Sequence, residues 1–271
     1  MKIWQNIILY MLLMPAIGLS QITTEFGVNS QTELPSSYLK ALIWNVHAGE
    51  HIDFPSDYRT LSRNMHLMLM QEVDLNNSLQ SILEDAPLYF THAKSYISPL
   101  SGNKKGIATA STAKPITSRA IRSNVVEFGA TTPKAVLVQL YNLSNRKDKL
   151  LVVNVHAINF VTNEMFYNHI DQIIKAIKFH QGAAFIAGDF NTWNKSRLHY
   201  LDNQMKKLNI NRLSFSNGRS AFPSIGRWFG VDIGGEFDQV YSRGLKIRFK
   251  EVHAWSQSSD HKPIEVHFSV L

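Results

Sequence analysis

Cysteine is absent from the 271-residue sequence, and its absence excludes three kinds of chemistry. Without a thiol, the chain can form no disulfide, no zinc–thiolate site and no cysteine nucleophile. Its stability must therefore come from a packed core, for which 44% hydrophobic residues are ample material.

Linkers and repeats are also missing. No stretch is rich in proline, glycine or serine, no block of charge reaches five residues, and no segment recurs at a fixed period. The length and the 18% of charged residues are compatible with one large domain or two small ones. Because nothing divides the chain, we predict one domain over residues 21–271.

Charge is scarce at the N-terminus, where only Lys2 precedes the apolar run IILYMLLMPAIGL and small or polar residues follow to Gln21. This layout is typical of a secretory signal peptide over residues 1–20, with cleavage after Ser20. The alternative is an uncleaved membrane anchor over residues 3–19, although the run is short for a membrane span. Both interpretations place the folded part outside the cytoplasm, either periplasmic or secreted.

Acidic residues are in the minority. The chain holds 28 Lys and Arg against 21 Asp and Glu, which gives a formal net charge of +7. Removing Lys2 with a signal peptide leaves 27 against the same 21, a net charge of +6. A basic surface suits nucleic acid or anionic lipid head groups, but solubility alone also accounts for it. The charge is therefore only weak support for a polyanionic partner.

Hydrophobic periodicity predicts a mixture of strands and helices. Apolar residues recur at helical spacing over residues 164–180, with Gly182 placed to end the helix, and further helices are expected over 75–83 and 195–208. Apolar, β-branched runs between turn residues predict strands over residues 38–47, 65–73, 106–111, 125–128, 135–143, 149–156, 183–187, 237–245, 246–255 and 263–270. Because strands come in runs, we predict an α/β protein of mixed (α+β) type, with mixed sheets covered by helices.

The stretch AAFIAGDFNTWN, residues 183–194, joins a buried strand to a polar pair. If the strand geometry continues beyond the apolar run, Asp189 and Asn191 share one face, because alternate residues of a strand point the same way. Phe190 then returns to the packed interior. Strand ends of this kind are places where sites are built.

Polar residues stand at several other predicted strand boundaries. A lone aspartate there is more often a turn former or a helix cap. Six such positions in one chain instead indicate a site assembled from several strands. They are Asn45, Glu72, His156, the pair Asp189 and Asn191, the pair Asp260 and His261, and Asp238, which opens a strand.

Seven segments resemble, in this order, the endonuclease/exonuclease/phosphatase superfamily, which includes pancreatic-type deoxyribonuclease, abasic-site endonucleases, bacterial sphingomyelinases and inositol-polyphosphate phosphatases. They are IWNVH, MQEV, GIATAS, VNVHAINF, AGDFNTW, FDQVYSRG and SSDHKPIEV, spanning residues 43–266. GDFN and SDHxP are the specific signals, and VNVHAINF is most similar to bacterial members without an assigned substrate. The resemblance implies a deoxyribonuclease-like, four-layer sandwich of two packed mixed β-sheets flanked by helices.

The same resemblance implies hydrolysis of a phosphate ester by water with the help of Mg²⁺ or Mn²⁺. Such hard cations prefer oxygen ligands and need only one or two protein carboxylates. Glu72 matches the principal metal ligand of the family, with Asn45 beside it, and Asp260 matches a further metal position. The residues alone leave open that Glu72 caps the start of a helix.

Five residues match the reacting groups of the family. Asp189 resembles the carboxylate that activates water, and Asn191 the residue that orients it. His261 matches the catalytic histidine, with Asp238 favouring its protonated form, and an imidazolium would stabilise charge that grows in the transition state. His156 matches a second histidine that contacts phosphate. From the residues alone, an Asx turn at Asn191 and a core position for His156 remain alternatives.

Three features bear on the substrate. Residues 106–111 hold no carboxylate to pair with His156, as the deoxyribonuclease branch has, so the resemblance does not extend to a general-acid role for that histidine. The abasic-site branch has an acidic residue where this chain has His47. Lys104 and Lys105 are expected either at a phosphate or in a solvated turn.

A glycine-rich loop over residues 221–237 precedes Asp238. Its residues Arg227, Trp228 and Phe229 are candidates to touch a base, a lipid or a lid surface. Packing of the two aromatic rings onto the sheets is the alternative.

Nuclease activity is the first expectation, followed by cleavage of phospholipid or sphingomyelin, and then by removal of phosphate from inositol phosphates. A fold family cannot decide among them, because substrate choice depends on the loops around a shared site. A noncatalytic binding module is the alternative of another class, although all the principal positions keep competent side chains. No stable protein partner is evident, and we expect a monomer.

Overall fold

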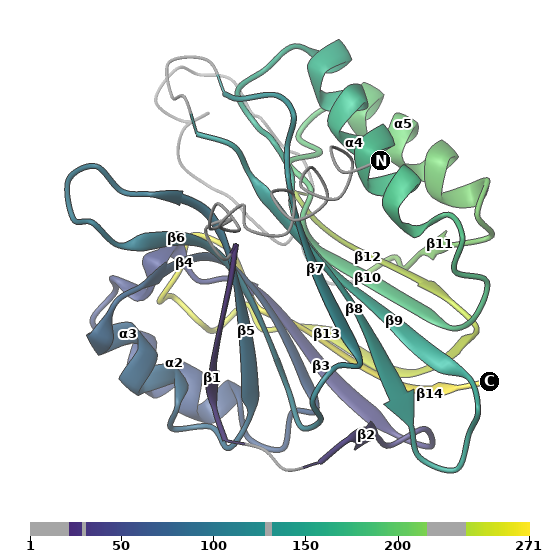
Figure 1. Cartoon of the computed structure of the whole chain (residues 1–271), viewed down its shortest axis with the longest axis horizontal. Helices are drawn as coiled ribbons and strands as arrows, with labels where there is room; N and C mark the ends of the chain where they lie inside the picture. The colour runs from purple at the N-terminus through teal and green to yellow at the C-terminus, as the bar shows by residue number, and fades with distance from the viewer. Residues whose placement is uncertain (1–21, 29–30, 128–131, 216–236) are drawn as a thin grey trace, which may run out of the picture.

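The computed structural model describes residues 22–28, 31–127, 132–215 and 237–271. In these parts two seven-stranded sheets pack face to face, with helices on their outer faces (Figure 1). The first sheet is covered by α2 (Phe54–Leu61) and α3 (Asn77–Leu83), and the second by α4 (Asn163–Ile177) and α5 (Lys195–Lys206). The predicted four-layer α/β sandwich is confirmed. No helix in the described ranges combines the length and apolarity needed to cross a membrane.

Both sheets are mixed. The first has the order β1 (Thr23–Gly27), β5 (Tyr89–Ile97), β6 (Lys104–Ser111), β4 (Leu67–Leu75), β3 (Leu39–Asn45), β14 (Ile264–Val270), β13 (Leu245–Val252). The second has the order β11 (Asn211–Arg212), β12 (Asp238–Arg243), β10 (Ala184–Asp189), β9 (Lys149–His156), β8 (Ala135–Leu143), β2 (Glu33–Leu34), with β7 (Thr117–Arg122) also paired to β8. The parallel pairs β3–β4 and β9–β10 end at a common edge of the molecule.

Central strands of the two sheets, such as β3, β9 and β10, are apolar on both faces because both faces are covered. In β3, Ala41 and Ile43 pack between the sheets, whereas Leu42 and Trp44 pack beneath α2 and α3. The same alternation runs through β9 and β10, whose outer faces pack beneath α4 and α5. The inner layer therefore fixes which side chains reach the edge of the inter-sheet core.

Helix α4 carries the predicted apolar stripe into the second sheet. Phe166, Ile170, Ile173 and Ile177 are buried, and the Thr162 hydroxyl caps the helix by accepting from Met165 N. The helix ends at Ile177, five residues before the glycine expected to end it. Apolar periodicity thus located the helix but not its C-terminus.

One strand prediction is wrong, and other strands were missed. Val125–Glu127 form no strand, because the Ser123 hydroxyl and the Gln172 side chain turn the chain out of β7 at this point, and Phe128 lies outside the described residues. Strands β1, β5 and β7 were not predicted. In β5, the buried residues include His92 and Lys94, which hide the apolar pattern of an interior strand.

A buried amide pair joins the sheets near the edge where the parallel strands end. Gln71 Nε2 of β4 donates to Asn154 Oδ1 of β9 (2.7 Å), and Asn154 Nδ2 donates to the carbonyl of Ala108 (2.9 Å). Gly188 allows β10 to lie against this pair: its φ is 141°, and a Cβ there would meet Val155 O at 2.1 Å and Gln71 Nε2 at 3.0 Å. The sheets are held at a fixed separation beside the polar strand ends.

His169 of α4 is a buried histidine that the fold keeps neutral. Its Nδ1 accepts from the backbone N–H of Ile158 (3.2 Å), and burial lowers its pKa to about 4. The unfolded chain takes up a proton near pH 6.5, whereas the folded chain does so only near pH 4. This histidine therefore contributes stability that is present above pH 6.5 and is lost as the pH falls toward 4, by roughly 3 kcal/mol.

We predict that His169→Asn flattens the acid limb of the stability curve. Asparagine keeps an acceptor for Ile158 N but does not titrate, so the free energy of unfolding should fall less between pH 6.5 and 4 than it does in the parent protein. Urea unfolding at a series of pH values measures this, with the exposed His199→Asn as control. Equal slopes for His169→Asn and the parent would contradict the assignment.

Candidate active site

At one edge of the sheets, polar side chains replace the apolar side chains that pack between the sheets elsewhere. Each occupies an inner-face position beyond the residues that pack between the sheets: Asn45 on β3, His156 on β9, Asp189 on β10 and Asp238 on β12. Along the second sheet, His156 lies opposite Asp189, and Asp189 lies opposite Asp238. The site is thus the polar end of the inter-sheet core.

Glu72 reaches this edge through a β-bulge and not from a strand end, as the sequence had suggested. Strand β4 continues to Leu75, and its register with β6 shifts between Met70 and Val73. In a regular strand Glu72 would share the face of Met70, which packs beneath α2 and α3. The bulge, in which Glu72 has a φ of 55°, instead turns the carboxylate toward the site. It caps no helix.

The Glu72 carboxylate lies among cationic and polar groups. Its Oε1 is 3.8 Å from His156 Nε2 and its Oε2 is 3.6 Å from His47 Nδ1, and about a third of the side chain is exposed. Burial alone would raise the pKa of Glu72, but the neighbouring His47 and the charge of Lys134 hold this pKa well below its usual range. A carboxylate that is ionised and partly exposed is suited to bind a cation.

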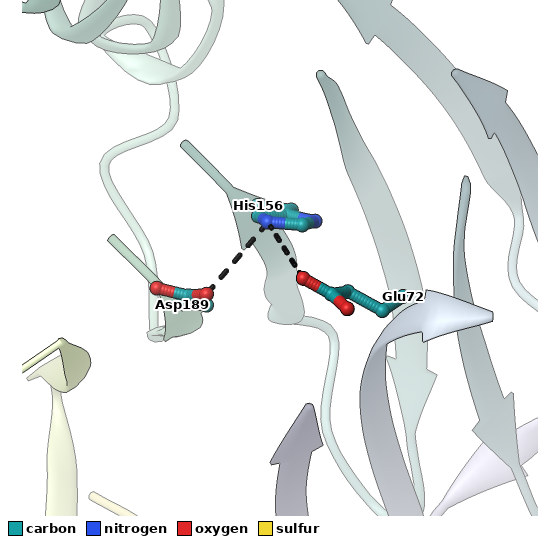
Figure 2. Close-up of side chains that lie close together, drawn as sticks. All are labelled: Glu72, His156 and Asp189. Atoms are coloured by element: carbon teal, nitrogen blue, oxygen red, sulfur yellow. Dashed lines mark ion pairs between the residues drawn. The ribbon is translucent and has the colours of Figure 1, made fainter. Parts of the chain in front are cut away.

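Asp189 is almost fully buried, and its charge is disfavoured. Burial raises the pKa of its carboxyl, with Asp238 and Glu72 adding repulsion against the opposing attraction of His261. Its Oδ2 lies 3.7 Å from His156 Nε2 and 3.8 Å from His261 Nε2 (Figure 2 shows the first of these contacts). Asp189 is therefore more basic than an ordinary aspartate and faces both imidazole rings.

His261 and Asp238 form a buried ion pair. His261 Nδ1 donates to Asp238 Oδ2 at 2.8 Å. Burial would lower the pKa of His261, but Asp238 and Asp189 outweigh it and raise this pKa to about 10. The ring is an imidazolium at neutral pH, with Nε2 turned to Asp189.

His156 has the opposite character. Its ring is buried, and burial followed by the charge of Lys134 lowers its pKa well below the usual value. The ring is therefore neutral, and Figure 2 shows it between the carboxylates of Glu72 and Asp189. It belongs to the cluster and not to the apolar core.

Asn45 and Asn191 hold the backbone and carboxylate in place. Asn45 Nδ2 donates to Asp189 Oδ2 (3.2 Å), while its Oδ1 accepts from His47 N (3.1 Å). Asn191 N donates to Asp189 Oδ1 (3.0 Å), which closes an Asx turn. The expected extended geometry fails here, because Asn191 has a φ of 51° and its amide donates to Ala157 O. Phe190 is buried beneath α4 and α5, as predicted.

Asp260 comes from the loop between β13 and β14. Its Oδ1 is 3.6 Å from His47 Nδ1, and its side chain is partly exposed. The Ser259 hydroxyl anchors the loop by donating to Asn45 O (2.6 Å), and the hydroxyls of Ser256 and Ser258 both donate to Asp57 of α2. The carbonyl of Asn45 and the carboxylate of Asp57, on two distant segments, thus hold the loop of Asp260 and His261 at the edge.

Arg197 of α5 connects the segments that follow β9 and β10 at the site. This buried arginine donates to the carbonyls of Asn159 (2.9 Å) and Val161 (2.7 Å) after β9, and to that of Asn191 (3.3 Å) after β10. Its guanidinium also stacks on Phe166 and Trp193. Nothing in the sequence signals this role, since an arginine in a polar helix is ordinarily exposed.

Lys134 and Glu127 are further neighbours that sequence reasoning missed. They form a nearly buried pair (3.6 Å), and Glu127 accepts from Asn159 N. No sequence pattern indicated these two residues, because they flank an irregular segment without strand or helix periodicity. Lys104 and Lys105, by contrast, are bound by Thr24 and Asp74.

The loop candidates Arg227, Trp228 and Phe229 lie outside the described residues.

The residues fit a divalent cation. Glu72, His156 and Asp189 offer ligand atoms that lie within 4.8 Å of one another. The resemblance pointed to Glu72, Asn45 and Asp260, so the two sets share only Glu72. We favour Glu72 and Asp260 for a hard cation, because both are partly exposed carboxylates, whereas the Asn45 amide turns its nitrogen to Asp189. Glu72 is the anchor in either set.

Comparisons with known proteins agree with this fold. A sequence model described as the endonuclease/exonuclease/phosphatase family matches residues 42–261. A UPF0294 protein of Vibrio campbellii is 30% identical over 234 residues, covering 86% of this chain and 78% of that protein. An endonuclease/exonuclease/phosphatase structure from Beutenbergia cavernae has a TM-score of 0.68 at 13% identity, covering 86% and 72% of the chains. D. rerio TDP2 in complex with a single-strand DNA product has a TM-score of 0.59 at 13% identity, covering 86% and 100%.

We predict that Asp238→Asn lowers the pKa of His261 from about 10 toward its ordinary value of 6.5. The amide keeps an acceptor for Nδ1–H but removes the charge that favours the imidazolium. NMR titration of the imidazole shifts measures the pKa in metal-free protein. Glu265→Gln is the matched control, since Glu265 contacts His253 and His267 instead. An unchanged His261 titration in Asp238→Asn would overturn the assignment.

Proposed function

The chain belongs to the endonuclease/exonuclease/phosphatase family, whose hydrolases act on phosphoester bonds, and we propose that its own reaction is the metal-dependent cleavage of phosphodiesters. One observation carries the proposal. The Asp189 carboxylate, which burial makes basic, faces the His261 imidazolium at 3.8 Å, and Asp238 holds that imidazolium in its charged form. A general base for the attacking water and a positive charge for the phosphate therefore lie side by side.

Glu72 would hold Mg²⁺ or Mn²⁺, with Asp260 as a second carboxylate. Its ionised state, maintained by neighbouring cations, fits that task. When bound, such an ion supplies positive charge that stabilises a phosphoryl oxygen.

Asp189 takes the proton of the attacking water. A general base works best when its pKa lies near the working pH, and burial shifts the carboxyl in that direction. The donors Asn45 Nδ2 and Asn191 N fix the carboxylate, so that an oxygen lone pair stays available in one orientation. We propose that Asn191 also orients the water.

The two histidines contact the phosphate in different states. His261, as an imidazolium, places charge beside the oxygens that become more negative in the transition state. His156 is neutral and donates or accepts one hydrogen bond without adding charge. Preorganised donors of this kind need no rearrangement as the reaction proceeds.

Nucleic acid is the substrate class that we propose first. The net charge of +7 supports a polyanion, and the structural neighbour D. rerio TDP2 was solved with a single-strand DNA product. Phospholipid or sphingomyelin, and inositol phosphates, are the competing substrates. We also propose that the protein acts outside the cytoplasm, because residues 1–20 have the composition of a signal peptide. We further propose that it acts as a monomer.

We expect Asp189→Asn to lower kcat/KM by about 100-fold or more, because an amide cannot accept the proton of water. The assay uses the full-length protein on bis-p-nitrophenyl phosphate and plasmid DNA, with Mg²⁺, with Mn²⁺ and with chelator. Asp148→Asn, an exposed carboxylate away from the cluster, is the matched control. Hydrolysis that survives chelator, or full activity of Asp189→Asn, would contradict the proposed mechanism.

A nuclease should also lose activity steeply with salt. When the salt concentration rises from about 50 to 200 mM, DNA binding should weaken roughly threefold for each phosphate contact, because counterions compete with the protein. Measuring KM for DNA and for sphingomyelin vesicles across this range separates the two classes. A salt-independent KM for DNA, together with faster cleavage of vesicles, would assign the site to lipid.

A further inference from the structure

His47 reaches the cluster from a strained turn directly after β3. His47, Ala48 and Gly49 have φ values of 44°, 58° and 66°, so three successive residues adopt the left-handed conformation. The left-handed conformation is disfavoured for the first two because they carry a Cβ, whereas glycine adopts it freely. The turn folds back on β4, and His47 N donates to Asn45 Oδ1 (3.1 Å). The base of the imidazole side chain is thereby fixed beside the site.

The ring nitrogen of His47 lies between two carboxylates. Nδ1 is 3.6 Å from Glu72 Oε2 and also 3.6 Å from Asp260 Oδ1. Both separations exceed the 2.7–3.2 Å of a well-formed hydrogen bond, so the nitrogen is not committed to either partner. The side chain is half-exposed and both carboxylates are partly exposed, so a solvent ion can reach them.

The donor set at this point contains nitrogen as well as oxygen. Two carboxylates alone suit Mg²⁺, which prefers oxygen ligands and keeps most of its water. An imidazole changes the preference, because nitrogen donors bind later divalent metals more tightly, in the order Mn²⁺, then Co²⁺.

We propose that His47 is a ligand of the divalent cation held by Glu72 and Asp260, and that it shifts the preference of the site from Mg²⁺ toward Mn²⁺ and Co²⁺. This inference rests on the proposed function, since it requires the edge of the sheets to bind a cation. The competing interpretation is an ion pair, in which a protonated His47 occupies the site and is displaced by metal. The two interpretations predict opposite effects of removing the ring.

His47→Asn and His47→Asp separate them. Both residues tolerate the left-handed conformation, so the turn should be kept. Calorimetry on the full-length protein measures the Kd of Mg²⁺, Mn²⁺ and Co²⁺, and the visible spectrum of bound Co²⁺ reports on its ligands. His51→Asn, in the same segment and paired with Asp53, is the matched control.

We expect His47→Asn to weaken Mn²⁺ binding by roughly tenfold, and Co²⁺ binding by more, with Mg²⁺ changed by less than about twofold. The Co²⁺ spectrum should change in this variant but not in His51→Asn, and His47→Asp should favour Mg²⁺ over Mn²⁺ relative to the parent. Equal or tighter binding of all three metals by His47→Asn would overturn the ligand role. If the parent protein binds no divalent cation, the proposed function fails together with this inference; if it binds metal but His47→Asn matches it, only this inference fails.

Discussion

The amide pair of Gln71 and Asn154 is the contact on which the geometry of the site depends. Each sheet carries half of the cluster, and this pair joins the sheets next to Glu72 and His156. Both amides are completely buried, so breaking the bond would leave polar groups without water, at a cost of about 1–3 kcal/mol. Gly188 completes the contact, because any side chain at that position would push β10 away. The distance of Glu72 from His156 and Asp189, across the two sheets, depends on this contact.

Environment divides the cluster into groups with opposite properties. Asp189 and Glu72 are both carboxylates, yet burial raises the pKa of the first and neighbouring cations lower that of the second. His156 and His261 are divided in the same manner, since only His261 has a buried carboxylate as a hydrogen-bond partner. Pairs of like groups with separated pKa values are how one site performs acid and base chemistry at one pH. The chain achieves this without unusual residue types.

Much of this arrangement could be predicted from the sequence, because strand and helix periodicity is local. The stripe of α4 and the strand end at Asp189 are of this kind, and the motif order placed Asp238 and His261. The bulge at Glu72 could not be predicted, since a shift of register depends on pairing with β6. β5 was missed because tertiary contacts, and not its own apolar residues, bury His92 and Lys94. The burial of Arg197 could not be predicted for the same reason, because this helix residue becomes interior only when the segments after β9 and β10 cover it.

Arg197 has a consequence for how the molecule accommodates a substrate. Since one guanidinium holds carbonyls from the segments behind both His156 and Asp189, those segments cannot shift independently. The hydrogen bonds of Arg197 tie the positions of these two segments to each other. Adjustment to phosphate esters of different shape must therefore come from the side of the site formed by the first sheet. There the turn of His47 and the loop of Asp260 are exposed to solvent.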